Sequence, residues 1–296
     1  MAAKKNALTA ELPGLEAPLI GPTGRVRRIF PEPARLNGHG PARIIALCNQ
    51  KGGVGKTTTT INLGASLAEC GRRVLAVDFD PQGALSAGLG VPTHDVPNIY
   101  DLLLGTIKDP REAIQKTTIE NLDIIPANID LSAAEVHLVN EVAREQILAR
   151  VLRGVKDNYD VILIDCQPSL GILTVNALTA AHGVLIPLEC EFFALRGVAL
   201  LVETIEKVKD RLNPAIELDG ILATMFDART LHAREVLDRV VETFGEKVFE
   251  TVIGRTVKFP DASVAGAPIT TFAPDHPAAR AYRQMARELI FRGAVA

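Results

Sequence analysis

Residues 43–60 read RIIALCNQKGGVGKTTTT, and this stretch decides the fold. The apolar run at 44–47 is typical of a buried parallel strand. A turn containing Gly52, Gly53 and Gly55 follows, and the apolar spacing beyond it predicts a helix. Glycines allow several backbone N–H groups to point to one place, and a helix N-terminus adds partial positive charge there. The order of strand, glycine turn and helix therefore predicts a phosphate-binding loop.

Two lysines and a threonine give this loop its expected chemistry. Lys56 is expected to reach the β- and γ-phosphate oxygens of a nucleotide, and the Thr57 hydroxyl to bind Mg²⁺. Gln50 occupies the position of the first glycine in the common pattern G-x-x-x-x-G-K-[ST], and a second lysine, Lys51, begins the loop. The alternative is a glycine turn that binds nothing. Two lysines converging on an apolar strand end would be costly there without an anion, so we predict a nucleotide site, with the helix beginning at Thr58.

Aspartates end two further predicted strands. Residues 73–78 (RVLAVD) end in Asp78, and Asp80 follows two positions later. One of these two carboxylates could hold Mg²⁺ or its water shell while the other positions an attacking water, and the pattern does not decide between them. Residues 159–165 (YDVILID) end in Asp165, a Walker-B-like pattern in which the carboxylate holds Mg²⁺ through water. The alternative is that such aspartates only cap a strand or turn.

Composition limits the class of protein. Of 296 residues, 47% are hydrophobic and 23% charged, which is ordinary for a soluble globular protein. Aromatic residues make up 4% and tryptophan is absent, which argues against stacking platforms for single-stranded nucleic acid. The four cysteines form no C-x-x-C pair and are predicted to be reduced thiols of a cytoplasmic protein. The net charge of −3 does not draw the whole chain to DNA, but residues 1–43 carry seven Lys and Arg against three Glu.

Alternating strands and helices predict an α/β fold with one doubly wound, mostly parallel sheet of the P-loop NTPase type in a single domain at 43–296. Residues 1–42, rich in proline and glycine, are predicted to be a disordered or loosely attached tail. Ser132 and Glu135 suggest a capping box at the start of a helix over 133–141. Residues 166–171 are expected to form a loop that senses the γ-phosphate. Further strands are predicted at 122–126, 184–188, 220–224 and 248–253, helices at 99–104, 195–212, 231–244 and 277–292, and a loop at 254–275.

Five segments resemble the ParA/Soj-type chromosome-partition ATPases, members of the ParA/MinD superfamily with a deviant Walker A loop. They read CNQKGGVGKTTTTINLG, VDFDPQGALSAGLG, IDCQPSLGILTVNAL, PLECEFFALRGVALL and TMFDARTL, and the resemblance covers about residues 43–292. It implies a slow, Mg²⁺-dependent ATPase that dimerises on ATP and binds double-stranded DNA non-specifically as the dimer. It further implies release from DNA after hydrolysis, stimulation by a ParB-like centromere-binding partner, and a cytoplasmic, nucleoid-associated protein.

The resemblance also assigns roles to residues. Lys51 matches the lysine that reaches the partner's phosphates, Asp80 the aspartate needed for hydrolysis, and Asp165 the Walker B residue. Lys51, Lys56 and Asp80 are thus the implied catalytic residues, and Gly52 the glycine at the dimer contact. Contacts to the ATP phosphates are implied for Lys51, Gly52, Gly53, Val54, Gly55, Lys56, Thr57 and Thr58, metal binding for Thr57, Asp80 and Asp165, and DNA contacts for Arg229, Arg255 and Lys258. Gly254 replaces a proline common in the family, close to the expected adenine.

The competing hypothesis is a MinD-like ATPase that acts on a membrane surface. Such a protein would need an amphipathic C-terminal helix, and apolar residues do share one face there: Tyr282, Met285, Ala286, Leu289 and Ile290. This set is short and lacks the bulky aromatic and basic excess of membrane-surface helices. We therefore expect the helix to pack on the protein, and we expect no membrane partner.

Overall fold

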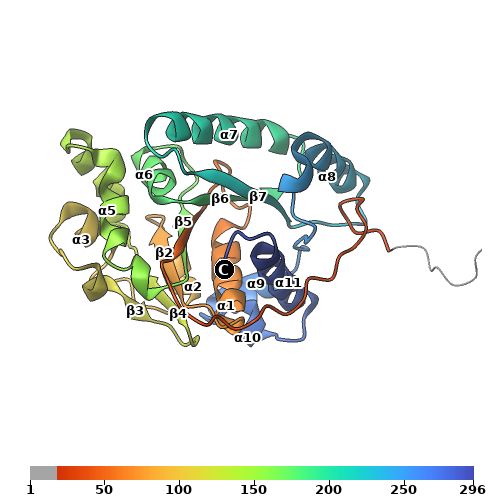
Figure 1. Ribbon diagram of the computed structural model, residues 1–296, viewed down its shortest axis with the longest axis horizontal. Helices are drawn as coiled ribbons and strands as arrows, with labels where there is room; N and C mark the ends of the chain where they lie inside the picture. The colour runs from red at the N-terminus through yellow and green to blue at the C-terminus, as the bar shows by residue number, and fades with distance from the viewer. Residues whose placement is uncertain (1–18) are drawn as a thin grey trace, which may run out of the picture.

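The computed structural model describes residues 19–296, and its centre is a seven-stranded sheet (Figure 1). The strand order is β3-β4-β2-β5-β1-β6-β7, and every pairing is parallel except that of β3 with β4. The strands are β1 (Arg43–Leu47), β2 (Val74–Phe79), β3 (Gln115–Lys116), β4 (Leu122–Ile125), β5 (Val161–Cys166), β6 (Gly183–Glu189) and β7 (Glu217–Thr224). This confirms the predicted α/β class and the mostly parallel sheet.

Helices cover both faces of the sheet, as Figure 1 shows, and each face has its own apolar core. One core lies under α3 (Ile99–Leu104), α4 (Leu131–His137), α5 (Ile147–Arg153), α6 (Ile172–Ala180), α7 (Ala194–Arg211) and α8 (Leu231–Phe244). The other lies under α1 (Lys56–Glu69), α2 (Ala84–Gly88), α9 (Lys258–Val264), α10 (Ile269–Phe272) and α11 (Pro277–Phe291). None of these helices is long and apolar enough to cross a membrane.

The register of the central strands sets the position of the loop and the aspartates. Leu47, the last residue of β1, pairs with Asp165 of β5, and Asp165 pairs with Asp78 of β2. Because parallel strands end at the same edge, both aspartates lie beside the loop that leaves β1. Helix α1 begins at Lys56, two residues earlier than predicted, so the lysine itself lies in its first turn.

The predicted strand at 248–253 was wrong. Two isolated bridges, Val248 with Ile221 and Gly254 with Phe226, link this part of the chain to β7 and the residues just after it. The N–H groups of Phe249 and Ile253 also donate to the carbonyls of Ile221 (2.9 Å) and Ala223 (2.8 Å), but no continuous ladder forms. Between these two hydrogen bonds, the Glu288 carboxylate accepts from the N–H groups of Glu250 (2.7 Å) and Thr251 (2.9 Å) and interrupts the pairing. A segment whose N–H groups are satisfied by a side chain has no need of a strand partner.

Other boundaries also differ. The predicted capping box is wrong, because α4 begins at Leu131 and the Ser132 hydroxyl donates to the carbonyl of Ile129 (2.8 Å). Helix α6 was not predicted, and the expected loop at 254–275 contains the short helices α9 and α10.

Residues 19–42, which belong to the segment predicted as a disordered or loosely attached tail, lie along the body as a strap. Phe30 is buried and its ring lies 5.4 Å from that of Phe291. Arg25 donates to the carbonyl of Val248 (2.9 Å), and the Ala34 carbonyl accepts from Arg72 (2.9 Å). These anchors are isolated among prolines and glycines, so the sequence shows no periodicity that would reveal them. The remainder of the tail, residues 1–18, lies outside the described residues.

Candidate active site

Hydrogen bonds hold the glycine loop to β6 and β7, the two strands on the side of β1 away from β5. Gly53 and Gly55 have positive φ values of 75° and 84°, a backbone conformation that favours glycine. The Thr224 hydroxyl at the end of β7 donates to the carbonyl of Val54 (2.7 Å). Asn49 donates to the carbonyl of Pro187 in β6 (2.7 Å) and accepts from the Lys51 N–H (3.0 Å). Sequence reasoning missed Asn49 and Thr224, because their partners lie far away in the chain.

Thr57, Lys56 and Asp165 converge at the start of α1. The Thr57 hydroxyl donates to Asp165 Oδ2 (2.7 Å), and the Thr60 hydroxyl lies 3.4 Å from Asp165 Oδ1. Lys56 is buried, and its Nζ donates to the carbonyl of Lys51 (3.1 Å). Burial lowers the pKa of Lys56, and the nearby charge of Asp165 opposes that shift. The structure thus brings together the lysine, hydroxyl and carboxylate that the sequence singled out.

Asp165 of this cluster has a second buried carboxylate, that of Asp78, as its neighbour on the adjacent strand. Burial raises the pKa of Asp165 to about 8, and the neighbouring Asp78 contributes to the shift. Burial also raises the pKa of Asp78, to about 7. Among residues 19–296, the side-chain hydrogen bonds to Asp165 come from hydroxyls, and no lysine or arginine forms an ion pair with it. An undercompensated carboxylate beside a threonine hydroxyl fits a hard divalent cation, which prefers oxygen ligands.

Asp78 and Asp80 have different surroundings. The Oδ2 atom of Asp78 accepts from the Ser86 hydroxyl (2.6 Å) and the Ser86 N–H (2.9 Å), and its side chain is fully buried. The same Ser86 hydroxyl accepts from the Ala127 N–H (3.2 Å), so Asp78 holds together the ends of β2, α2 and β4. Asp80 is only partly buried, and its Oδ1 accepts from the Gln82 N–H (3.0 Å). Asp80 is therefore the more accessible of the two carboxylates.

Lys51 lies in an ion-pair cluster of its own chain. Its Nζ is 3.1 Å from Glu189 Oε2 and also contacts Glu191. Glu189 is the last residue of β6, and its other oxygen, Oε1, lies 2.8 Å from Arg255 Nη2.

An apolar pocket of about 270 Å³ adjoins the loop. Gly55 and Thr58 line one side of it, and Ile253, Phe259 and Pro260 line the other. Its size and apolar walls suit a flat aromatic base. Gly254, which replaces the family's proline, lies outside the lining and forms the bridge to Phe226.

The three cations expected to contact DNA come from two neighbouring segments. The Phe226–Gly254 bridge and the hydrogen bond from Arg255 N–H to the Phe226 carbonyl (3.3 Å) hold these segments together. Each cation has an acidic partner: Arg229 with Asp227 (2.7 Å), Arg255 with Glu189 (2.8 Å) and Lys258 with Asp261 (3.3 Å).

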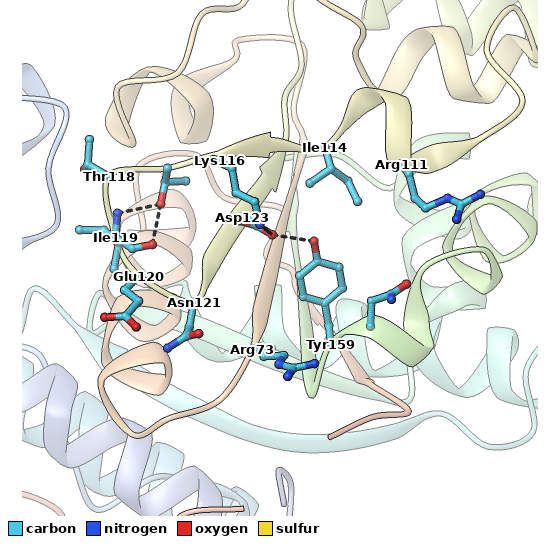
Figure 2. A pocket seen from close by; sticks show the side chains of 12 residues that line it. Arg73, Arg111, Ile114, Lys116, Thr118, Ile119, Glu120, Asn121, Asp123 and Tyr159 are labelled. Carbon is cyan, nitrogen blue, oxygen red and sulfur yellow. Dashed lines mark hydrogen bonds and ion pairs between the residues drawn. The ribbon is translucent and has the colours of Figure 1, made fainter. Parts of the chain in front are cut away.

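A larger cavity, of about 660 Å³, lies at the opposite edge of the sheet (Figure 2). Asp123 lies at its centre and accepts from the Tyr159 hydroxyl (2.8 Å) and from Lys116 (2.8 Å). Burial and the bond to Asp123 raise the pKa of Tyr159. These polar groups satisfy one another, and they lie near the first residues of β2 and β4, away from the glycine loop.

Comparison with known proteins agrees with this geometry. Residues 42–218 match a family described as an AAA domain. The sporulation initiation inhibitor protein Soj of Bacillus subtilis is 48% identical over 252 residues, which cover 85% of this chain and 99% of Soj. The chain belongs to the ParA/Soj-type ATPases.

Two further comparisons extend the match. An uncharacterized protein of Mycobacterium tuberculosis is 61% identical over 274 residues, 92% of this chain and 86% of that protein. The crystal structure described as a cobyrinic acid a,c-diamide synthase of Mycobacterium smegmatis, with bound ADP and magnesium, is 41% identical, with a TM-score of 0.74. It covers 86% of this chain and 96% of that one. The ParA/Soj-type chain is thus an ATP hydrolase with the P-loop fold that the sequence predicted.

Proposed function

We propose that this ParA/Soj-type ATPase binds Mg²⁺ and ATP, forms a nucleotide-dependent dimer that attaches non-specifically to DNA, and leaves DNA after hydrolysis. Chromosome partition in the cytoplasm, at the nucleoid, is the process that this cycle serves. The observation that carries the proposal is the convergence of Lys56, Thr57 and Asp165 at the N-terminus of α1, with Thr57 and Asp165 2.7 Å apart.

Each residue of the cluster has a role in hydrolysis. Thr57 and Asp165 would hold the Mg²⁺ ion, with Asp80 nearby, and the ion neutralises phosphate charge when bound. Lys56, together with the backbone N–H groups from Gly52 to Thr58, binds the phosphates. Lys51 of the partner subunit adds a second cation as negative charge develops. Asp80 orients the attacking water, because Asp78 is already occupied by Ser86.

Arg229, Arg255 and Lys258 would bind DNA phosphates. The cation side chains of their present ion pairs are 45% to 90% exposed, so solvent screens these pairs and DNA phosphates can replace the acidic partners. A dimer doubles the number of phosphates neutralised and makes the affinity strongly dependent on salt. Slow hydrolysis keeps the dimer on DNA until a ParB-like partner accelerates the reaction.

The MinD-like alternative would need an exposed apolar face on α11. In α11 the side chains of Tyr282, Met285, Ala286 and Leu289 are buried in the core shared with α1, so they do not form a face available to lipid. This packing is what the sequence analysis expected of the last helix.

The test compares Asp80→Ala with Lys56→Ala and Gly52→Val in the presence of ATP and Mg²⁺. We expect Asp80→Ala to accumulate as a dimer on unrelated duplex DNA, because nucleotide binds but is not hydrolysed. The other two variants should stay monomeric and unbound. Light scattering and DNA retardation measure both outcomes. An Asp80→Ala dimer that ignores DNA at low salt and sediments with anionic liposomes would instead support the membrane alternative.

The basic tail is a separate part of the hypothesis. Residues 1–40 add positive charge and could add DNA affinity. Deleting them and finding unchanged salt-dependent DNA binding would rule out that contribution.

A further inference from the structure

One carboxylate, that of Glu189, contacts two residues with different roles in the proposed cycle. Its Oε2 lies 3.1 Å from Lys51 Nζ, and its Oε1 lies 2.8 Å from Arg255 Nη2. Lys51 is the residue proposed to cross to a partner subunit, and Arg255 is proposed to bind DNA. The two cations therefore share a single acidic group.

The position of this carboxylate is well defined. Glu189 ends β6, where it pairs with Thr224 of β7, and its side chain is only 12% exposed. Thr224 in turn holds the glycine loop through the Val54 carbonyl. The strand end therefore fixes Glu189 between the glycine loop and the segment that carries Arg255.

Glu191 contacts only one of the two cations and therefore serves as the comparison residue for Glu189. It also contacts Lys51, but its side chain is 54% exposed, and among the described residues its ion pair is with Lys51 and not with Arg255. Burial alone would lower the pKa of Lys51, but the bonds to Glu191 and Glu189 outweigh it and raise the pKa. The two glutamates together hold the lysine in its own subunit.

We propose that Glu189 is a positioning residue that restrains both dimerisation and DNA binding, because Lys51 and Arg255 compete for the single negative charge of its carboxylate. This inference rests on the proposed function. Lys51 must leave Glu189 and Glu191 before it can reach a partner's phosphates, so these contacts raise the nucleotide concentration needed for dimerisation. Once Lys51 has crossed to the partner, Glu189 has lost a counter-charge and holds Arg255 more tightly, which weakens DNA binding by the dimer. Conversely, loss of the Arg255 charge should make Glu189 hold Lys51 more tightly.

The first experiment measures the restraint in the nucleotide-free protein. The rate at which acetic anhydride acylates Lys51 is followed by mass spectrometry, with Lys207 as internal reference, because Lys207 pairs with Glu203 on the surface of α7. Glu189→Gln and Glu191→Gln should each accelerate acylation of Lys51 about threefold, given the modest strength of such ion pairs. Arg255→Gln should slow it about twofold, because the lysine then has Glu189 to itself.

Matched controls make this result specific. Arg229→Gln removes a comparable exposed arginine that pairs with Asp227, and it should leave acylation of Lys51 unchanged. In the double variant Glu189→Gln/Arg255→Gln, the arginine change should have no further effect. An Arg255→Gln variant that does not slow acylation, or that slows it equally in the Glu189→Gln background, overturns the competition.

The second experiment measures the cycle with a non-hydrolysable ATP analogue and a 40-base-pair duplex. Glu189→Gln and Glu191→Gln should both dimerise at about threefold lower analogue concentration. Only Glu189→Gln should also tighten DNA binding of the dimer by about threefold, because only it releases Arg255. Equal DNA affinity of the two variants overturns the shared role of Glu189. If the wild-type chain does not dimerise at all, the proposed function fails, while the acylation rates still decide whether Glu189 restrains Lys51.

Discussion

The two ends of strand β5 hold aspartates that differ sharply, although both are buried. Asp160 precedes the strand at the amino edge of the sheet and accepts from the N–H groups of Arg73 (2.7 Å) and Gly40 (2.9 Å). His39 Nδ1 lies 2.8 Å from it. Although burial alone would raise the pKa of Asp160, these hydrogen bonds lower it. Asp165, at the carboxyl edge, has hydroxyl partners, and its pKa is raised to about 8.

This difference separates a carboxylate whose charge the chain satisfies, Asp160, from Asp165, which we propose holds a metal ion. The chain satisfies the charge of Asp160 from within, so Asp160 stabilises the fold. The chain leaves the charge of Asp165 undercompensated, so that a bound cation can satisfy it. Burial alone does not distinguish the two residues; their hydrogen-bond partners and their opposite ends of β5 do.

The largest expected effect is on hydrolysis. Asp165→Asn should lower Mg²⁺-dependent ATP hydrolysis at least about 100-fold, because the carboxylate that would hold the ion is gone. Phosphate release measures the rate, and circular dichroism checks that the variant remains folded. Activity within a few-fold of the wild type would contradict a metal-holding role and remove the contrast with Asp160.

The corresponding change at the amino end of β5 tests whether Asp160 stabilises the fold. Asp160→Asn should lower the free energy of unfolding by roughly 2 kcal/mol, because a buried, hydrogen-bonded charge is lost. Urea unfolding of the nucleotide-free protein measures it. His39→Ala removes one of the three partners of Asp160 and should lower the free energy of unfolding by less than Asp160→Asn does. Hydrolysis per folded molecule should persist in Asp160→Asn, and its loss would mean that both ends serve the active site.

The pH dependence of stability sharpens the same comparison. The folded chain holds protons on Asp78 and Asp165 up to about pH 7 and 8, whereas the unfolded chain releases them near pH 4. Because the folded state binds more protons in this window, the free energy of unfolding should fall as the pH rises from about 5 to 8. Asp165→Asn should weaken this dependence by about 1 kcal/mol or more between pH 6 and 8. Urea titrations of both proteins measure it, and identical slopes would show that Asp165 is ionised when folded.

The smallest effect is expected at the cavity of about 660 Å³ near the first residues of β2 and β4. Lys116 donates to Asp123, but its side chain is 84% exposed. Lys116→Gln should therefore change the free energy of unfolding by less than about 0.5 kcal/mol. Tyr159→Phe, which leaves the buried Asp123 without its hydroxyl donor, is the matched comparison and should cost more. Equal effects in thermal unfolding would show that the exposed lysine contributes as much as the buried hydroxyl.

Local patterns predicted the centre of the molecule well. The glycine loop and Asp165 follow apolar strands directly, and parallel pairing then brings them together without further information. The choice between Asp78 and Asp80 depended on Ser86, whose hydroxyl reaches back from α2. The segment at 248–253 has the composition of a strand, but Glu288 in α11 accepts from two of its N–H groups, those of Glu250 and Thr251. Contacts between side chains and distant backbone leave no local pattern, so these features could not be predicted.

The strap gives the chain a particular order of assembly. It leaves the ribosome before any strand of the sheet, yet Phe30 packs on Phe291, and Arg72, which holds the Ala34 carbonyl, also donates to the carbonyl of Ala296. Its docking surface is complete only after the final helix has been synthesised. We therefore expect the first described segment to be among the last to find its place, with Phe30 exposed until α11 has been synthesised.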